Sequence, residues 1–253
     1  MNSSSTVKIA HLLYLFYYVF MIEPASKNKT TSAQEGMAGS SRLHRKLKSG
    51  MVASHRTIDM LFDDSPIQEM SRRHGLKTFF MEGYMDSAQY EWIEKLFAVE
   101  SISKVVQTGF NAGHSAFAFA NLGSDTVTSF DINHHPYVRP AHEYLIKRFP
   151  ATNFSLILGD SLETVPAHKD EVLYDIAFID GGHSQSVAYS DLFTMRRLVK
   201  DKSYVIMDDY GDSFPWQVGP TLAYDQAISD GLIKPMCVEH TKKSSWALGQ
   251  YDD

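Results

Sequence analysis

Carboxylate side chains follow two apolar runs in the second half of the chain, at the points where each run ends. Asp180 opens the segment 180–183 (DGGH) after one run, and Asp208 and Asp209 follow the next run. If the runs are neighbouring parallel strands, these carboxylates meet at one edge of a sheet. Three anions that close repel one another unless a cation lies among them, and their oxygens favour Mg²⁺ over zinc. The pattern predicts a divalent-cation site; the alternative is that these aspartates only cap turns.

His183 lies three residues after the first of these carboxylates. An imidazole with an ordinary pKa of about 6.5 can accept a proton from a substrate hydroxyl whose acidity a metal ion has raised. We therefore interpret His183 as the candidate catalytic proton acceptor. The competing interpretation is a histidine at a helix start without a catalytic task, since the chain contains 11 histidines.

A glycine-containing turn follows an earlier apolar run. In the segment 107–115 (QTGFNAGHS), Gly109 and Gly113 are four residues apart. Glycine permits positive φ and lets a ligand approach the backbone closely. The spacing matches neither the G-x-G-x-x-G dinucleotide fingerprint nor a P-loop, which argues against a nicotinamide-dependent oxidoreductase. By itself the turn indicates either ligand binding or tight packing.

Two more acidic residues end predicted strands. Asp131 comes about 20 residues after the glycine turn, at a position where a carboxylate can accept hydrogen bonds from both hydroxyls of a ribose. Asp160 precedes Ser161 and is placed to accept an amino hydrogen of an adenine. For both aspartates, and for Ser161, capping of the following helix is the alternative.

The elements that would position these residues alternate from residue 86 onward, because short apolar runs are separated by helical periods. Such alternation is typical of βαβ units around a parallel sheet. We predict strands over 104–108, 126–130, 153–158, 174–179 and 203–207, and helices over 86–98, 114–122, 137–149, 161–168 and 184–199.

The last part of the chain predicts a different connection. A helix after residue 217 ends at Gly231, and the runs 235–240 and 245–251 read as an antiparallel hairpin. The predicted fold class is α/β, a Rossmann-like, doubly wound, mostly parallel seven-stranded sheet that ends in this hairpin.

Taken together, these motifs resemble the class I S-adenosylmethionine-dependent methyltransferases, over roughly residues 86–251. The phrases FIDGGHS and MDDY, with Asp180, Asp208 and Asp209, resemble the divalent-metal site of the macrocin and catechol O-methyltransferase groups. The Asp-Asp pair is nearer the macrocin type. The family usually has Glu or Asp where this chain has Gln107. The resemblance implies that the donor is bound by Gln107, Gly109, Asn111, Gly113, Ser115, Asp131, Ile132, Asp160, Ser161 and Asp180.

The implied function is divalent-metal-assisted O-methylation of a small hydroxylated acceptor, such as a diol, a sugar or a catechol. The implied cofactors are S-adenosylmethionine and Mg²⁺. The alternative is a catalytically silent binding or scaffold protein on the same fold, tethered by its N-terminal segment.

Composition and charge limit the other classes. With 253 residues, 43% hydrophobic and 21% charged, the chain is an ordinary globular protein of one domain with an appendage. Residues 61–253 hold 16 Lys/Arg against 27 Asp/Glu, so a nucleic-acid partner is not expected. The lone Cys237 excludes an internal disulfide. A small-molecule substrate is the expected partner, and self-association as a homo-oligomer stays open.

The N-terminal segment divides into three predicted parts. Residues 1–25 contain an uncharged apolar run at 9–22, which predicts a signal or a membrane anchor, with a buried helix as the alternative. Residues 26–50 predict a disordered basic linker. Residues 51–253 are the predicted catalytic domain, with helical decoration before residue 86. If 9–22 acts as a signal, the chain enters the secretory pathway or a membrane; otherwise we expect a cytoplasmic protein.

Overall fold

A computed structural model describes residue 85 and residues 87–169, 172–241 and 244–252. The predicted signal or anchor at 1–25 and the linker at 26–50 lie outside the described residues, as does the predicted helical decoration apart from Met85. Within the described ranges, no helix combines the length and the apolar character that a membrane crossing needs.

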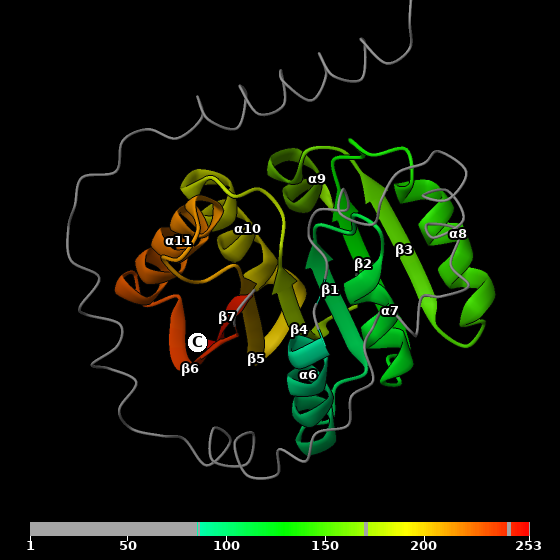
Figure 1. The fold of residues 1–253 in the computed structure, drawn as a ribbon, viewed down its shortest axis with the longest axis horizontal. Helices are drawn as coiled ribbons and strands as arrows, with labels where there is room; N and C mark the ends of the chain where they lie inside the picture. Colours follow the sequence, from blue (N-terminus) through cyan, green and yellow to red (C-terminus); the bar gives the residue numbers. More distant parts are fainter. Residues whose placement is uncertain (1–84, 86, 170–171, 242–243, 253) are drawn as a thin grey trace, which may run out of the picture. The chain divides into compact units, whose positions relative to one another are not determined.

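One seven-stranded sheet forms the centre of the described part (Figure 1). Its order is β3-β2-β1-β4-β5-β7-β6, with the first five strands parallel and β7 antiparallel to both β5 and β6. This arrangement confirms the predicted fold class. The strands are β1 (Lys104–Thr108), β2 (Thr126–Asp131), β3 (Asn153–Leu158), β4 (Tyr174–Ile179), β5 (Val199–Asp208), β6 (Ile233–His240) and β7 (Ser245–Tyr251).

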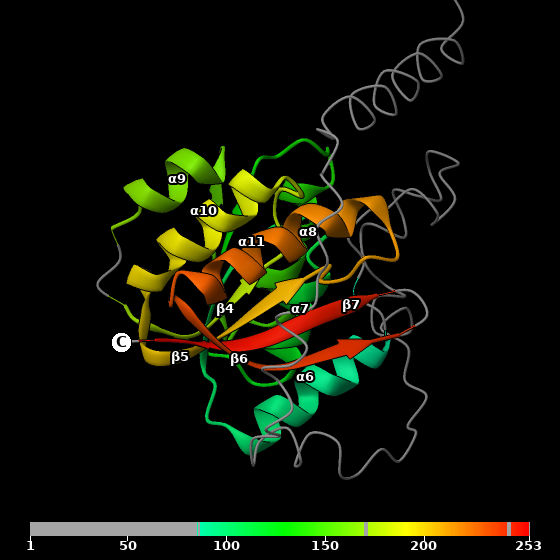
Figure 2. The ribbon, with the colours of Figure 1, turned by 90° about the vertical axis from the view of Figure 1, so that its left-hand side faces the viewer.

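Helices cover both faces of the sheet, as Figure 2 shows for α9, α10 and α11. That set packs on the face that carries Val106, Ala177 and Val205, and α6, α7 and α8 pack on the opposite face around Val105 and Phe178. Because β1 and β4 are covered on both sides, their apolar runs are nearly continuous. The helices are α6 (Ser87–Val99), α7 (His114–Asn121), α8 (Val138–Arg148), α9 (Ser161–Ala167), α10 (Gln185–Met195) and α11 (Val218–Ser229).

The start of β5 differs from the prediction. The helix expected over 184–199 ends at Met195, a short 3₁₀ turn covers Arg196–Leu198, and β5 begins at Val199 instead of residue 203. Val199 is buried, but the next three residues of this strand, 200–202, are exposed and polar, and Lys202 adopts a positive φ of 58°. Its residues therefore lack the apolar alternation by which a strand is recognised in a sequence.

Candidate functional site

The carboxyl ends of the parallel strands meet where the strand order reverses, between β1 and β4. From β1 the chain proceeds outward through β2 to β3, and then returns to the other side of β1 with β4 and β5. In such sheets ligands bind in the crevice above this reversal. The predicted site residues leave from the ends of these five strands, so the topology gathers them at one edge.

The glycine turn after β1 packs directly on the backbone after β4. Gly109 has φ 79°, and a Cβ at this position would lie 1.8 Å from the carbonyl oxygen of Asp180. Only glycine fits so close an approach. Asn111 also has a positive φ, of 48°, and Gly113 has φ 81°. The turn is therefore held in one conformation by its positive φ angles and by close packing against the backbone after β4.

Asp131, at the end of β2, fixes the same turn from the other side. Its two carboxylate oxygens accept hydrogen bonds from the backbone N–H groups of Asn111 (2.7 Å) and Asn133 (2.6 Å). The next residue, Ile132, is 52% exposed, although a large aliphatic side chain favours burial. The half-buried carboxylate of Asp131 and the exposed apolar side chain of Ile132 thus lie next to each other in the sequence at the edge of the crevice.

The other predicted donor-binding residues occupy different surroundings. Asp160 caps α9, accepting a hydrogen bond from Leu162 N (2.9 Å), so the capping alternative holds for its side chain. Gln107 is fully buried; its Nε2 donates to Ser129 Oγ (2.8 Å), whereas its Oε1 has no partner. Ser115 is buried in the first turn of α7. The roles of these three residues toward a donor stay predictions.

Acidic residues after β4 and β5 lie close together with His183. Asp180, His183 and Asp209 each place one potential ligand atom within 4.8 Å of the others. His183 Nε2 lies 3.1 Å from Asp209 Oδ2. Asp208 is not part of this trio, and its Oδ1 accepts a hydrogen bond from Gln89 Nε2 (2.7 Å).

Burial first, and then the charges of neighbouring acids, raise the pKa values of two of these acids, Asp180 and Asp208. Burial, followed by the charge of Asp209, raises the pKa of Asp208 to about 7. Burial also raises the pKa of Asp180 well above its ordinary value, and the charges of Asp208 and Asp209 add to this effect. A cluster that resists ionisation is the environment in which a bound cation or a proton-transfer step is favoured.

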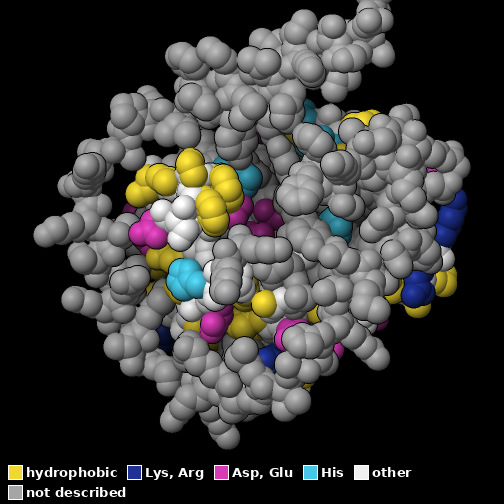
Figure 3. All heavy atoms as spheres, in the orientation of Figure 1, with side chains coloured by type: hydrophobic (Ala, Val, Ile, Leu, Met, Phe, Trp, Pro, Cys, Tyr) yellow, Lys and Arg dark blue, Asp and Glu magenta, His cyan; other side chains and the backbone are white. Residues whose placement is uncertain are grey.

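Aromatic residues line the segment after β5. The rings of Phe214 and Trp216 stack with centroids 4.6 Å apart and planes 5° apart. Gln217 holds this segment, because its Oε1 accepts from the N–H groups of Ser213 and Phe214, both at 3.1 Å. Figure 3 shows hydrophobic side chains gathered over the α10 and α11 region, beside a histidine and acidic side chains.

Gly219 connects this aromatic segment to the cluster. A Cβ at Gly219 would lie 2.0 Å from the carbonyl oxygen of His183. The start of α11 is therefore seated against the backbone of the proton-acceptor candidate. Tyr210 faces elsewhere: it is buried, and its hydroxyl donates to Asp225 Oδ1 (2.9 Å).

Sequence reasoning missed Gln89, which is 1% exposed in α6. A signal existed, because Gln89 stands four residues before Ile93 and seven before Leu96, on the apolar side of that helix. A polar residue in such a stripe predicts a buried hydrogen bond. The identity of its partner, Asp208, could not be read from the sequence.

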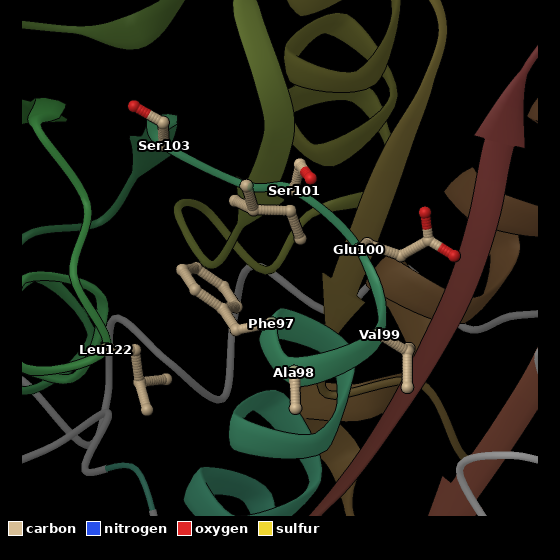
Figure 4. A pocket seen from close by; sticks show the side chains of 8 residues that line it. Phe97, Ala98, Val99, Glu100, Ser101, Ser103 and Leu122 are labelled. Carbon is tan, nitrogen blue, oxygen red and sulfur yellow. The ribbon is translucent and has the colours of Figure 1, made fainter.

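A pocket at the opposite edge of the sheet offers little chemistry (Figure 4). The end of α6, the segment that leads into β1 and Leu122 line it. Its one ionisable side chain, Glu100, points away from Phe97 and Leu122 in Figure 4 and acts on Tyr204. The carboxyl edge is therefore the better candidate site.

A family model matches the part of the chain that carries most of these residues. Residues 106–210 match the model of a family described as a methyltransferase domain. That range runs from β1 to the residue after Asp209 and contains most of the predicted site. A search of curated proteins finds no match.

Solved structures share the fold at low sequence identity. A putative O-methyltransferase from Klebsiella pneumoniae has a TM-score of 0.61 at 13% identity, covering 80% of this chain and 93% of its own. An O-methyltransferase from Bacillus cereus, in complex with SAH, has a TM-score of 0.57 at 14% identity, with coverages of 77% and 97%. TomG, an O-methyltransferase from Streptomyces achromogenes in complex with SAM, gives 0.58 at 12%, with 73% and 87%.

Proposed function

We propose that this chain, whose residues 106–210 are a methyltransferase domain on a Rossmann-like methyltransferase fold, transfers the methyl group of S-adenosylmethionine to a hydroxyl of a small acceptor. One observation carries the proposal: the glycine turn, the ribose-side acid Asp131 and the cluster of Asp180, His183 and Asp209 all lie at one sheet edge. The sequence resemblance suggests that this acceptor is a diol, a sugar or a catechol.

The donor would occupy the crevice between the glycine turn and Asp131. Gly109 sets the shape of the turn by packing on the carbonyl of Asp180, and Asp131 can accept from the ribose hydroxyls with the lone pairs that its two backbone bonds leave. Ile132 would cover one face of the adenine. Methyl transfer is a direct displacement, so the acceptor oxygen must lie in line with the methyl group and lose its proton.

His183 would take that proton. Its Nε2 lies 3.1 Å from Asp209 Oδ2, and a carboxylate at this distance stabilises the imidazolium that forms. The stacked pair Phe214 and Trp216 would form one wall of the acceptor pocket and limit the access of water. The proton acceptor and the wall are thus held by adjacent backbone segments.

A divalent cation is the second part of the proposal. The donor set fits one, since Asp180 and Asp209 supply carboxylate oxygens within 4.8 Å of each other. Such an ion would lower the pKa of the acceptor hydroxyl. The third ligand is Asp208, as the sequence predicted, which lets His183 serve as the proton acceptor. The alternative third ligand is His183, whose ligand atom lies within 4.8 Å of those of Asp180 and Asp209, and in that case it would not be the proton acceptor. An imidazole ligand would shift the preference from Mg²⁺ toward Mn²⁺ or a similar transition metal.

Two experiments test these parts separately. Transfer of a labelled methyl group from S-adenosylmethionine to a panel of catechols, sugars and diols, with and without chelator, tests the reaction; no transfer to any acceptor would support the silent-binding alternative. Titration of Mn²⁺ followed by its electron paramagnetic resonance, in wild type, His183→Gln and Asp208→Asn, tests the metal. The variant that loses Mn²⁺ binding identifies the third ligand, and full retention of the free-ion signal in wild type would reject a metal site.

A further inference from the structure

A buried carboxylate lies beneath the crevice without a role in the proposed chemistry. Asp191, in α10, has none of its surface exposed. Neither of its oxygens has a partner at full hydrogen-bonding geometry, although the hydroxyls of Ser161 and Thr108 lie near enough to lower its pKa. Burial outweighs them and raises this pKa to about 6. A buried acid so weakly satisfied costs stability, so fold stability does not explain it.

The neighbours of Asp191 belong to three different strand-end loops. Thr108 ends β1 and precedes Gly109, and Ser161 opens α9 after Asp160. Gly181 follows Asp180, and a Cβ built on it would lie 2.9 Å from Asp191 Oδ2 and 3.1 Å from Thr108 Oγ1. A single carboxylate therefore adjoins the loops after β1, β3 and β4, each next to a predicted donor-binding residue.

We propose that Asp191 is a positioning residue for the methyl donor, which fixes the three loops relative to one another from below the crevice. It acts through Thr108, Ser161 and Gly181 and does not itself contact the donor. The inference rests on the proposed function, because it takes these loops as the donor site. It adds a residue that no donor-binding motif of the sequence contains.

A second aspartate provides a matched control at the other edge of the sheet. Asp175 Oδ2 accepts hydrogen bonds from the N–H groups of Ser103 (2.9 Å) and Lys104 (2.8 Å), and its Oδ1 accepts one from Lys200 Nζ. These partners lower its pKa against the effect of burial. This carboxylate has the partners that a structural role requires, and it is far along the strand from the crevice.

The test compares Asp191→Asn with Asp175→Asn in the full chain. Calorimetric titration with S-adenosylmethionine and with S-adenosylhomocysteine gives Kd, and urea unfolding gives the midpoint. We expect Asp191→Asn to raise both Kd values about tenfold with an unchanged or higher midpoint, because the charge that orders the loops also costs stability. Asp175→Asn should lower the midpoint and leave both Kd values unchanged. Gly181→Ala, which pushes a Cβ onto Asp191, should weaken the donor similarly.

Three results would overturn the inference. The first is an unchanged Kd in Asp191→Asn, and the second is a fall of its midpoint in step with its affinity, as for a purely structural residue. The third is a loss confined to S-adenosylmethionine, which would indicate attraction of the sulfonium charge and not loop positioning. If wild type binds neither ligand, the proposed function itself is wrong. If wild type binds and Asp191→Asn binds equally well, only the inference about Asp191 is wrong.

Discussion

The two edges of the parallel sheet treat buried polar groups in opposite ways. At the amino edge, Asp175 accepts hydrogen bonds from two backbone N–H groups and from a lysine, and its pKa is lowered. At the carboxyl edge, Asp180, Asp191 and Asp208 have raised pKa values, with burial as the largest cause of each. The difference indicates that the amino edge is organised for stability, whereas the carboxyl edge keeps groups that a ligand could satisfy.

Glycine conformation offers the strongest way to test that contrast. Gly109 and Gly231 both have positive φ, but a Cβ at Gly109 would meet the carbonyl of Asp180 at 1.8 Å, whereas Gly231 has open space around it. We expect Gly109→Ala to weaken donor binding by more than about 100-fold, and Gly231→Ala to cost only about 1 kcal/mol of stability. Calorimetry and urea unfolding measure the two effects. Equal donor affinity in both variants would remove the glycine turn from the site.

The proton-acceptor assignment predicts the next largest effect. His183→Gln should lower kcat for methyl transfer about 100-fold and leave the donor Kd unchanged, because the side chain acts on the acceptor. The exposed His240 in β6 provides the control, since His240→Gln should alter neither quantity. Steady-state kinetics with labelled donor measures the change. A His183→Gln enzyme with wild-type kcat would exclude His183 as the proton acceptor.

The raised pKa of Asp191 predicts how stability depends on pH. The folded state binds the proton of Asp191 more tightly than the unfolded state does. The stability that this proton binding contributes is therefore present at low pH and is lost as pH rises from about 4 through about 6. The charge of Asp160, which caps α9, also raises this pKa, whereas hydrogen bonds from Ser161 and Thr108 lower it. Relative to wild type, Asp191→Asn should gain between about 1 and 3 kcal/mol between pH 4 and 7. Urea unfolding measures the free energy of unfolding of both proteins at each pH. A difference between the two proteins that stays the same from pH 4 to pH 7 would contradict this assignment.

Substitution of Asp175 at the amino edge should have the smallest effect on stability. Its pH dependence should be opposite to that of Asp191. Asp175→Asn loses charge-assisted hydrogen bonds and should cost about 1 to 2 kcal/mol of unfolding free energy at pH 7. Because the pKa of Asp175 is lowered, its contribution is present above the unfolded pKa of about 3.9 and disappears as pH falls through the folded value. Urea unfolding at pH 7 and pH 3 should therefore show the difference only at the higher pH.

The fold was accessible to prediction because burial leaves a strong pattern. Strands β1 and β4 are covered on both faces, and their apolar runs gave the correct bounds, 104–108 and 174–179. The order reversal at β1 then placed Asp131, Asp180 and Asp209 at one edge. The early start of β5 was missed, because residues 200–202, which follow Val199, are exposed and polar.

The candidate site was less accessible, because its details depend on side-chain partners from distant elements. Gln89 donates a hydrogen bond to Asp208, and the two residues are 119 positions apart. Asp191 is a polar residue in a helix that buries it, and its neighbours come from β1, α9 and the loop after β4. No local pattern encodes such contacts, so neither could be derived from spacing or periodicity.

Binding of the methyl donor is the claim on which every role above depends. Isothermal titration of S-adenosylmethionine into the full chain, and into Asp131→Ala with the exposed-residue control Asp201→Ala, tests it most directly. We predict one donor per chain in wild type and Asp201→Ala, and at least about tenfold weaker binding in Asp131→Ala, because the ribose acceptor and the anchor of the glycine turn are lost together. Absence of binding heat in wild type, or equal affinity in all three proteins, would contradict the account.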